Sequence, residues 1–569
     1  MDINILVGGE AGQGIQTIGF VLGKTLVRGR LHVFADQDYE SRIRGGHNFF
    51  RIRVSDLPLT VQTEKLDIII SLDQRTIELH REDLKAGGAI ILDRSLVKVP
   101  DAPALLDVPL EKLSETASGD KIMSNSVAIG AALGLMGFEF AILSDTLTWH
   151  FAKLSTQVRE NNIKAARAGY DHARQHLPDD FKALCHSLGK GERLFLNANE
   201  ALALGSMAAG CNFLAAYPMT PITSIIEYVA DKGRRYGVAV IQPEDEISAI
   251  NMVIGASYAG ARAMTVTSGS GFALMVEGIG LAGITETPAV IVLGQRPGPA
   301  VGLPTRSEQG ELLFALNAGT GEFPRAVLAP SSAQEAFYLM PKAFNLAEKY
   351  QIPVIVLTDT HLANSYTDVE KFDLAKVKIE RGKLIDNSSA LKDYQRYELT
   401  DSGVSLRAIP GQGEALVCAD ADEHNAAGHL IEDIPTRVQQ MDKRLQKLET
   451  LKEEIADPLF ETQPGANLTL IGWGSTLGAI REAVALLKKQ SIQVNILHFS
   501  EIWPFPQEFV TNALQQTPGH VVIENNATGQ MATLIRQQTG IDISSRINKY
   551  DGRPLSAQYI VDELLKGVL

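Results

Sequence analysis

The chain has 569 residues, of which 45% are hydrophobic and 21% are charged, and its formal net charge is −14 at pH 7. At about 150 residues a domain, this length predicts three or four domains, and the composition is typical of a soluble globular protein. The acidic balance argues against a nucleic-acid-binding surface, and no apolar run is long enough to span a bilayer.

The start of the chain and its cysteines indicate a cytoplasmic protein. The opening sequence MDINILVGGEAGQG lacks the cationic and apolar regions of a signal peptide. The three cysteines, Cys185, Cys211 and Cys418, include no CxxC pair. We therefore expect no disulfide framework and no four-cysteine iron–sulfur cluster on this chain.

Residues 1–190 are predicted to form the first α/β domain. An apolar strand at 3–7 leads into a glycine turn, a helix near 17–28 and a second strand at 31–36. Two later apolar runs, DIIISL and GGAIILD, are compact enough to be buried parallel strands. A helical segment at 145–177 precedes a polar linker.

The glycine turn GGEAGQGIQT is the first candidate site. Glycines between a strand and a helix let the backbone approach an anion, which the helix N-terminus also favours. Asp36 lies 22 residues after Gly14, as in an NAD site, but Thr17 replaces the third glycine of that motif. A phosphate or nucleotide group contacting Gly12, Gly14 and Thr17, and a turn without a ligand, are both open; NAD is disfavoured.

A second candidate follows in the segment YESRIRGGH. Arg42 and Arg44 with Gly45 and Gly46 could present two guanidinium groups and bare backbone to a phosphorylated ligand. Taken alone, a solvated turn with ordinary surface charge is the simpler interpretation.

Residues 194–365 are predicted to form the second α/β domain. The strands VAVIQP, ARAMTVTS, PAVIVLG and IPVIVLTD are separated by helix-length segments. This alternation predicts a parallel sheet with helices on both faces.

Three successive strand ends in this domain carry polar groups. In the loop YPMTP, Pro218 and Pro221 fix φ and leave the hydroxyl of Thr220 on a rigid extended segment. Another strand end carries Glu244 and Glu246, and Arg296 directly follows a third. Because ligands bind at the carboxyl ends of parallel strands, these groups are expected at one edge of the sheet. A chance collection of loops is the alternative.

The rest of the chain divides into two parts. Residues 366–465 are the least regular stretch and end in a charged helix, RVQQMDKRLQKLETLKEEI, which we interpret as a solvated connector. Residues 466–569 are predicted to form a third, small α/β domain, with a helix capped by Ser475 and another beginning near Gln530.

With these residues in view, the chain resembles the 2-oxoacid:ferredoxin oxidoreductases over nearly all of its length. Residues 1–190 resemble the family's gamma domain through the glycine turn and the RIRGG segment. Residues 194–365 resemble the alpha subunit's thiamine-diphosphate pyrimidine domain, and 466–569 its transketolase-C-like domain, through GWGS and ENNATGQ. The resemblance implies an α/β fold of three α/β domains, in an alpha subunit with a fused gamma domain.

The family's loop reads YPITPSS, and its next glycine segment reads TSGPG. Here Tyr217, Pro218 and Thr220 are kept, so a hydrogen bond from Thr220 to substrate or cofactor is implied. Met219 departs from the family pattern, and the glycine segment is TSGSG at 267–271, which lacks the proline.

The resemblance also implies a catalytic glutamate and a substrate arginine. The glutamate falls on Glu246, because the downstream IGASYAG then aligns without a gap, and Glu244 stays a close alternative. Its carboxylate would bond to the pyrimidine N1′ of thiamine diphosphate and favour the tautomer that deprotonates the thiazolium. Arg296 is implied to pair with the carboxylate of the 2-oxoacid.

The chain lacks the GDG motif and following asparagine that hold the diphosphate and Mg²⁺ in thiamine enzymes. The resemblance therefore implies a beta subunit that carries Mg²⁺ and a [4Fe-4S] cluster, an active site between chains, a dimer of alpha–beta pairs, and ferredoxin as electron carrier. The gamma-type domain is implied to bind coenzyme A through Gly12 to Thr17 and Arg42 to Gly46. We expect no metal on this chain and no nucleic-acid or membrane partner.

Among family activities, the fused architecture most resembles the enzymes that convert 2-oxoglutarate to succinyl-CoA and CO₂. Arg306 is one candidate for the distal carboxylate. Pyruvate or a broad 2-oxoacid range is the alternative within the class, and a non-catalytic coenzyme-binding subunit is the alternative outside it.

Overall fold

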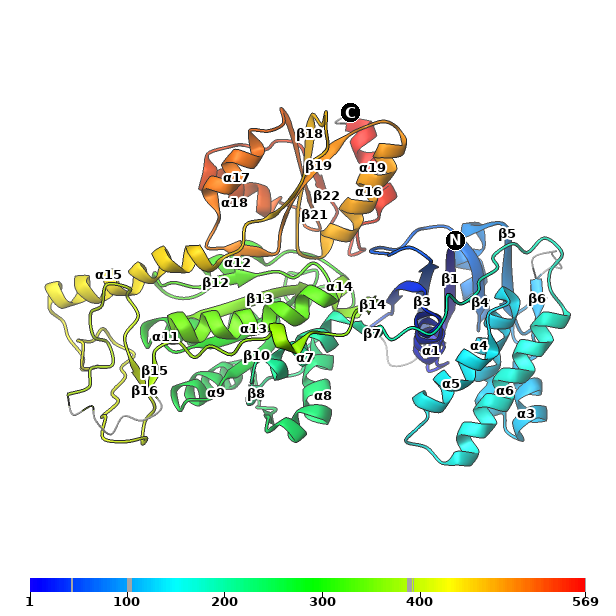
Figure 1. The fold of residues 1–569 in the computed structure, drawn as a ribbon, viewed down its shortest axis with the longest axis horizontal. Coiled ribbons are helices and arrows are strands. Elements are labelled where there is room, and N and C mark those ends of the chain that lie inside the picture. The colour runs from blue at the N-terminus through cyan, green and yellow to red at the C-terminus, as the bar shows by residue number, and fades with distance from the viewer. Residues whose placement is uncertain (42–44, 100–104, 386–390, 392, 568–569) are drawn as a thin grey trace. The chain divides into compact units, whose positions relative to one another are not determined.

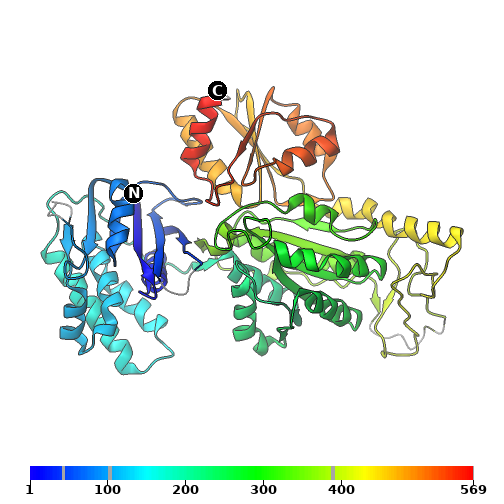
Figure 2. The same ribbon diagram turned by 180° about the vertical axis from the view of Figure 1, so that it is seen from behind.

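The computed structural model describes residues 1–41, 45–99, 105–385, 391 and 393–567. They form two compact units, the first made of Met1–Asn197 with Asn364–Lys371 and the second of Ala198–Ala363 with Phe372–Leu569. Figures 1 and 2 show both units from opposite sides. The predicted α/β class is confirmed, since each unit has sheets flanked by helices. No helix in the described part of the chain is long and apolar enough to cross a membrane.

The first unit is built on an eight-stranded sheet with the order β6-β5-β4-β1-β3-β2-β14-β7. The two apolar runs predicted as parallel strands are β4 and β5, and β4 is parallel to both β1 and β5. The strands are β1 (Asp2–Ala11), β2 (His32–Asp38), β3 (Gly45–Ser55), β4 (Leu66–Ser71), β5 (Leu84–Leu92), β6 (Leu105–Asp107), β7 (Leu194–Asn197) and β14 (Tyr366–Val369).

Strand β3 was not predicted from the sequence, and it separates β1 from β2 as an antiparallel neighbour of both. Its arginines pair with carboxylates on the two flanking strands. Arg51 Nε and Nη2 donate to Asp36 on β2 at 3.0 and 2.6 Å, and Arg53 Nε and Nη2 donate to Asp2 on β1 at 2.9 and 2.6 Å. Cross-strand pairing thus allows an arginine-rich segment to be a central strand.

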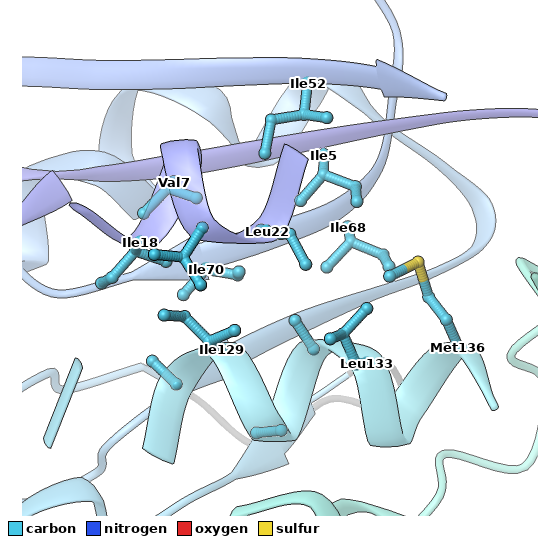
Figure 3. Close-up of a cluster of buried hydrophobic side chains, with 14 of the residues drawn as sticks. Ile5, Val7, Ile18, Leu22, Ile52, Ile68, Ile70, Ile129, Leu133 and Met136 are labelled. Carbon is cyan, nitrogen blue, oxygen red and sulfur yellow. The ribbon is translucent and has the colours of Figure 1, made fainter. Parts of the chain in front are cut away.

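Helices of the first unit cover this sheet. Figure 3 shows the core, in which Ile18 and Leu22 of α1 meet strand residues such as Ile5, and Ile129 and Leu133 of α4. The helices are α1 (Ile15–Arg28), α2 (Gln74–His80), α3 (Leu110–Ser118), α4 (Ser124–Met136), α5 (Phe140–His150) and α6 (Thr156–Gln175). The predicted helical segment at 145–177 is thus the end of α5 and the whole of α6, interrupted at 151–155.

Strand β7 was expected to begin the second domain, but it belongs to the first unit's sheet. It pairs antiparallel with β14, which returns from much later in the chain. Asp368 of β14 accepts from Val33 N at 2.8 Å and lies 2.9 Å from His32 Nδ1, and it also pairs with Arg193. These polar contacts, all within the first unit, join residues that precede the second unit in the sequence to residues that follow its main sheet. The boundaries of the three predicted domains otherwise stay a prediction.

The main sheet of the second unit has the order β20-β12-β13-β11-β10-β8-β9, and all its strands are parallel except β20. Every residue of β10, β11 and β13 is buried, as expected for a parallel sheet covered on both faces. The strands are β8 (Phe213–Ala215), β9 (Ala239–Ile241), β10 (Ala263–Ser268), β11 (Ala289–Gln295), β12 (Ala326–Leu328), β13 (Pro353–Asp359) and β20 (Glu501–Trp503). The helices are α7 (Ala198–Ala208), α8 (Thr223–Lys232), α9 (Glu246–Tyr258), α10 (Gly269–Leu274), α11 (Val276–Ile284), α12 (Leu312–Asn317), α13 (Ala333–Tyr350) and α14 (Thr360–Asn364).

A smaller sheet in the same unit has the order β17-β19-β18-β21-β22. Ser475 is not the predicted N-cap, because its hydroxyl donates to Asp359 Oδ2 at the end of β13 instead. The strands are β17 (Leu459–Glu461), β18 (Leu468–Trp473), β19 (Val494–Phe499), β21 (Gly519–Glu524) and β22 (Arg546–Asn548). The helices are α16 (Leu477–Lys489), α17 (Gln507–Leu514), α18 (Gln530–Thr539), which begins where predicted, and α19 (Ala557–Gly567).

The prediction of a solvated connector is wrong for the charged helix α15 (Ile434–Leu451). Lys443 and Lys447 are buried, and their ammonium groups lie 2.6 and 2.5 Å from the carboxylate of Glu286. Charges of opposite sign can be buried together where each satisfies the other, which a charge count along the helix does not reveal. Two short strands, β15 (Leu384–Ile385) and β16 (Arg407–Ala408), precede this helix.

Candidate active site

The predicted polar groups follow the carboxyl ends of β8, β9 and β11, and the TSGSG turn follows β10, in a sheet that runs β11-β10-β8-β9. Arg296 follows β11 directly, and its Nη1 donates to the backbone carbonyl oxygen of Thr220 at 2.7 Å. The side chain of Arg296 is buried, at 6% exposure, and burial lowers its pKa. The sequence prediction that Arg296 and Thr220 lie together therefore agrees with the geometry.

Glu246 is the first residue of α9 and is 6% exposed. The helix is capped by Asp245, whose carboxylate accepts from Ser248 N at 2.7 Å. A Cβ added to Gly271 would lie 2.5 Å from Glu246 Oε1, so the carboxylate lies against the TSGSG turn. Glu244, the alternative left open by the sequence, is exposed.

The proline loop packs on the same turn. The Ser268 hydroxyl lies 3.4 Å from Met219 Sδ, so the methionine that departs from the family pattern is a packing contact. Tyr217 is 39% exposed, and Pro218 and Thr220 are half-buried. The loop and the Glu246 carboxylate therefore both lie against the TSGSG turn.

A buried asparagine that the sequence reasoning missed holds the other side of the loop. Asn199 on α7 donates through Nδ2 to Pro221 O and to Ser224 Oγ, both at 2.8 Å. It is fully buried, so these bonds fix the loop relative to α7.

Glu311 is a second carboxyl group of the site that the sequence reasoning missed. It follows the loop after Arg296, and a Cβ added to Gly269 would overlap its Oε1. Burial and the neighbouring carboxylate of Glu308 raise the pKa of Glu311 to about 8, although Arg296 opposes the shift. The sequence could have indicated Glu311 as a site residue, because it lies in the same loop after β11 as Arg296.

The loop that carries Glu311 is attached to the smaller sheet by Gln309. Its Nε2 donates to Trp473 O at 2.9 Å, and its Oε1 accepts from Asn525 N at 3.1 Å. Gln530 adds a bond from its Nε2 to Gly310 O at 2.6 Å. The GWGS and ENNATGQ motifs therefore help to position a loop of the candidate active site.

The carboxylate of Glu524 organises these motifs in turn. It is fully buried and accepts from Trp473 Nε1 at 3.1 Å, Asn526 Nδ2 at 2.8 Å and the N–H of Met531 at 2.9 Å. Burial raises its pKa, and these hydrogen bonds oppose that shift. Its contacts hold β18, β21 and the start of α18 together.

A separate cavity of about 360 Å³ lies in the first unit beside the glycine turn. Gly12, Gly14 and Thr17 line it, and the first two have φ of 97° and 80°, in the left-handed region that favours glycine. Gly45 and Gly46 begin β3. Arg42 and Arg44 lie outside the described residues. The other residues lining the cavity are Glu10, Ala11, Ile15, Gln16, Gln37, Asp38, Tyr39, Glu40, Asn48 and Phe49.

The geometry further disfavours an NAD site in this cavity. Asp36, which would accept from a ribose hydroxyl, is bound to Arg51 on β3 and is 6% exposed. The strand after α1 is also not the neighbour of β1 that a dinucleotide-binding βαβ unit needs. As for metal sites, the residues that the structure describes contain no group of three or more His, Cys, Asp or Glu side chains that could hold a metal ion.

Comparison with known proteins identifies the family. The alpha subunit of a 2-oxoacid:ferredoxin oxidoreductase from Sulfolobus sp is 31% identical over 630 residues, covering 100% of this chain and 97% of the relative. The chain belongs to the 2-oxoacid:ferredoxin oxidoreductase family, as an alpha subunit. The resemblance inferred from the motifs is thereby confirmed.

One solved structure and one further sequence relative support the same family. The structure of 2-oxoglutarate:ferredoxin oxidoreductase from Magnetococcus marinus, with 2-oxoglutarate, coenzyme A and succinyl-CoA bound, has a TM-score of 0.92 and 30% identity, and the match covers 99% of each chain. The 2-oxoglutarate synthase subunit KorA of Methanothermobacter thermautotrophicus is 32% identical, covering 66% of this alpha subunit and 99% of KorA.

Three family models match successive parts of this alpha subunit. Residues 4–172 match pyruvate ferredoxin/flavodoxin oxidoreductase, and residues 466–560 match core domain II of pyruvate:ferredoxin oxidoreductase. Residues 204–443 match the thiamine-diphosphate-binding model of pyruvate flavodoxin/ferredoxin oxidoreductase. The candidate active site at Thr220, Glu246 and Arg296 lies within this last match.

Proposed function

We propose that this alpha subunit takes part in the oxidative decarboxylation of 2-oxoglutarate with coenzyme A, which yields succinyl-CoA and CO₂ and passes two electrons to ferredoxin. The observation that carries the proposal is the contact between Arg296 and Thr220, in a loop that packs on the same turn as the buried carboxylate of Glu246. A substrate-carboxylate partner and a buried acid–base group at one sheet edge are what a thiamine-dependent decarboxylation needs from the protein. A non-catalytic coenzyme-binding subunit would need neither.

Each residue of the candidate active site has a separate proposed role. The buried Glu246 holds the proton shared with the pyrimidine N1′, and its burial strengthens that interaction by excluding water. Arg296 presents a planar guanidinium that binds the substrate carboxylate and orients the keto carbon. Thr220 hydrogen-bonds substrate or cofactor, with Tyr217 and Pro218 shaping the loop. Bound thiamine diphosphate supplies the electron sink for loss of CO₂.

The proposal assigns the metal ion and the cluster to a partner subunit, and coenzyme A to the first unit. A beta subunit provides Mg²⁺, the diphosphate-binding half of the site and a [4Fe-4S] cluster that reduces ferredoxin, in a dimer of alpha–beta pairs in the cytoplasm. Coenzyme A binds the first unit, where the cavity at Gly12, Gly14 and Thr17 supports a phosphate contact. Arg42, Arg44, Gly45 and Gly46 stay proposed contacts for the same ligand.

The choice of 2-oxoglutarate is supported by similar proteins, which include the Magnetococcus enzyme with 2-oxoglutarate bound and KorA subunits of 2-oxoglutarate enzymes. Pyruvate is the second candidate, favoured by the descriptions of the matching family models. Arg306, on the loop after Arg296, stays the proposed partner of the distal carboxylate that pyruvate lacks.

The test is coenzyme A-dependent reduction of a viologen dye by the anaerobically purified complex of this chain with its native partner. We would compare 2-oxoglutarate, pyruvate and a branched 2-oxoacid. Reduction with 2-oxoglutarate alone is expected. Reduction with pyruvate instead would keep the reaction class and change the substrate. A complex that contains thiamine diphosphate and clusters but reduces the dye with no 2-oxoacid would contradict the proposal.

A further inference from the structure

The Oε2 atom of Glu311 is buried without a hydrogen-bond partner, in a side chain that is half-buried as a whole. Its backbone N–H is fixed by Gln295 Oε1 at 3.1 Å, and Gln295 directly precedes Arg296. Glu311 is the residue before α12, yet its side chain does not cap that helix and lies against Gly269 instead. The loop itself is held by Gln309 and Gln530, so this placement is imposed from several sides.

Two charged groups, Arg296 and Glu308, would interact with a negative charge on Glu311. Arg296 at the end of β11 attracts a negative charge on Glu311, and Glu308 on the same loop repels it. From α10 the carboxyl meets a glycine, which offers no side-chain donor. An ionised Glu311 would therefore have Arg296 as its main electrostatic partner.

We propose that Glu311 is a positioning residue kept as a neutral acid near Arg296, so that the guanidinium stays available to a 2-oxoacid carboxylate until Glu311 ionises at alkaline pH. The inference rests on the proposed role of Arg296 and adds a specificity-determining residue to the same site. The neutral form lets an anionic substrate approach, whereas the ionised form competes with that substrate for Arg296 and repels it.

The direction of the pH dependence follows from the groups named. Burial and the carboxylate of Glu308 raise the pKa of Glu311 and Arg296 lowers it, and together they bring this pKa to about 8. Below this value Glu311 is neutral and the substrate binds. Above it the competent fraction falls about tenfold for each pH unit, and the apparent affinity falls with it.

The experiment uses the whole complex with its partner and measures KM and kcat for the 2-oxoacid between about pH 6 and 10. KM of the wild type should rise about tenfold for each pH unit above the break, while kcat changes less. Glu311→Gln keeps the size of the side chain and removes the proton, so its KM should lose this alkaline rise. Glu308→Gln removes a repelling charge and should shift the break to lower pH. Glu322→Gln, an exposed change, is the matched control.

A second readout does not depend on turnover. The component of the protonated-carboxyl infrared band that the wild-type complex has and Glu311→Gln lacks should disappear as the pH is raised. An alkaline rise in KM that survives in Glu311→Gln, or an infrared band unchanged by that substitution, would overturn the inference. If no 2-oxoacid is turned over, the proposed function fails, and the infrared titration still decides whether Glu311 holds the proton.

Discussion

Lys443 Nζ donates to Glu286 Oε1 at 2.6 Å, and both side chains are buried. Lys447 lies 2.5 Å from the other carboxylate oxygen, and Arg396 donates to the backbone carbonyl of Glu286 at 2.7 Å. Burial alone would raise the pKa of Glu286, but the two ammonium groups outweigh it and lower that pKa. One carboxylate therefore attaches α15 to the turn that precedes β11.

Glu286→Gln is expected to destabilise the second unit. It leaves two buried ammonium groups without their counter-charge, which costs about 3–5 kcal/mol. The midpoint of urea unfolding, followed by circular dichroism, measures the loss. The control is Glu449→Gln on the same helix, whose partner Lys452 is exposed and whose loss should cost less than about 1 kcal/mol. Equal midpoints for the two variants would mean that the buried pair does not hold α15.

Glu246→Gln is expected to abolish turnover while the complex still assembles. The amide cannot hold the proton that the buried carboxylate holds, so kcat should fall by at least about 100-fold in the viologen assay. Glu244→Gln is a matched control two residues away, exposed to solvent, and should stay near the wild type. The reverse pattern, with activity lost only in Glu244→Gln, would move the role to Glu244.

The sequence predicted the α/β class and that Thr220 and Arg296 lie together, because alternating strands and helices fix where strand ends point. It did not predict β3, whose arginines look like surface charge until Asp36 and Asp2 are seen on the neighbouring strands.

The same limitation explains the errors at α15 and Glu311. Whether Lys447 is solvated depends on Glu286, more than a hundred residues earlier in the chain. Glu311 belongs to the site because Gln309 and Gln530 attach its loop to residues from another sheet. Such contacts are tertiary, and neither periodicity nor local composition contains them.

Gln309→Ala is expected to weaken both stability and substrate binding. The change leaves the buried Asn525 N–H without its side-chain partner, at about 1–3 kcal/mol. The Trp473 carbonyl loses one donor but still accepts from Thr476 Oγ1. Because the loop also carries Glu311, KM for the 2-oxoacid should rise. Thermal unfolding and steady-state kinetics are the measurements, with the exposed Gln516→Ala as control. A lower unfolding temperature with an unchanged KM would show that the loop keeps its position without the side-chain hydrogen bonds of Gln309.

Gly271→Ala is expected to remove activity without unfolding the protein. Gly271 lies in the helix α10, so its backbone conformation accepts alanine. Only the neighbouring side chains oppose the added methyl group. The added methyl would lie 2.2 Å from Thr267 Oγ1 and 2.5 Å from Glu246 Oε1, so both side chains have to move, and the carboxylate leaves the turn against which it lies. A displacement of this size at a group that must meet its partner within hydrogen-bond reach can cost about 100-fold in rate.

Gly255→Ala on α9 is the matched control, because nothing lies within 4 Å of its added Cβ. An alanine in a helix is favoured over glycine by about 0.5–1 kcal/mol, so this variant should be slightly more stable and fully active. Viologen reduction and thermal unfolding of the two variants, in the complex, separate the effects. Full activity in Gly271→Ala would mean that the position of Glu246 is not set by this turn, and would weaken its assignment as the catalytic carboxylate.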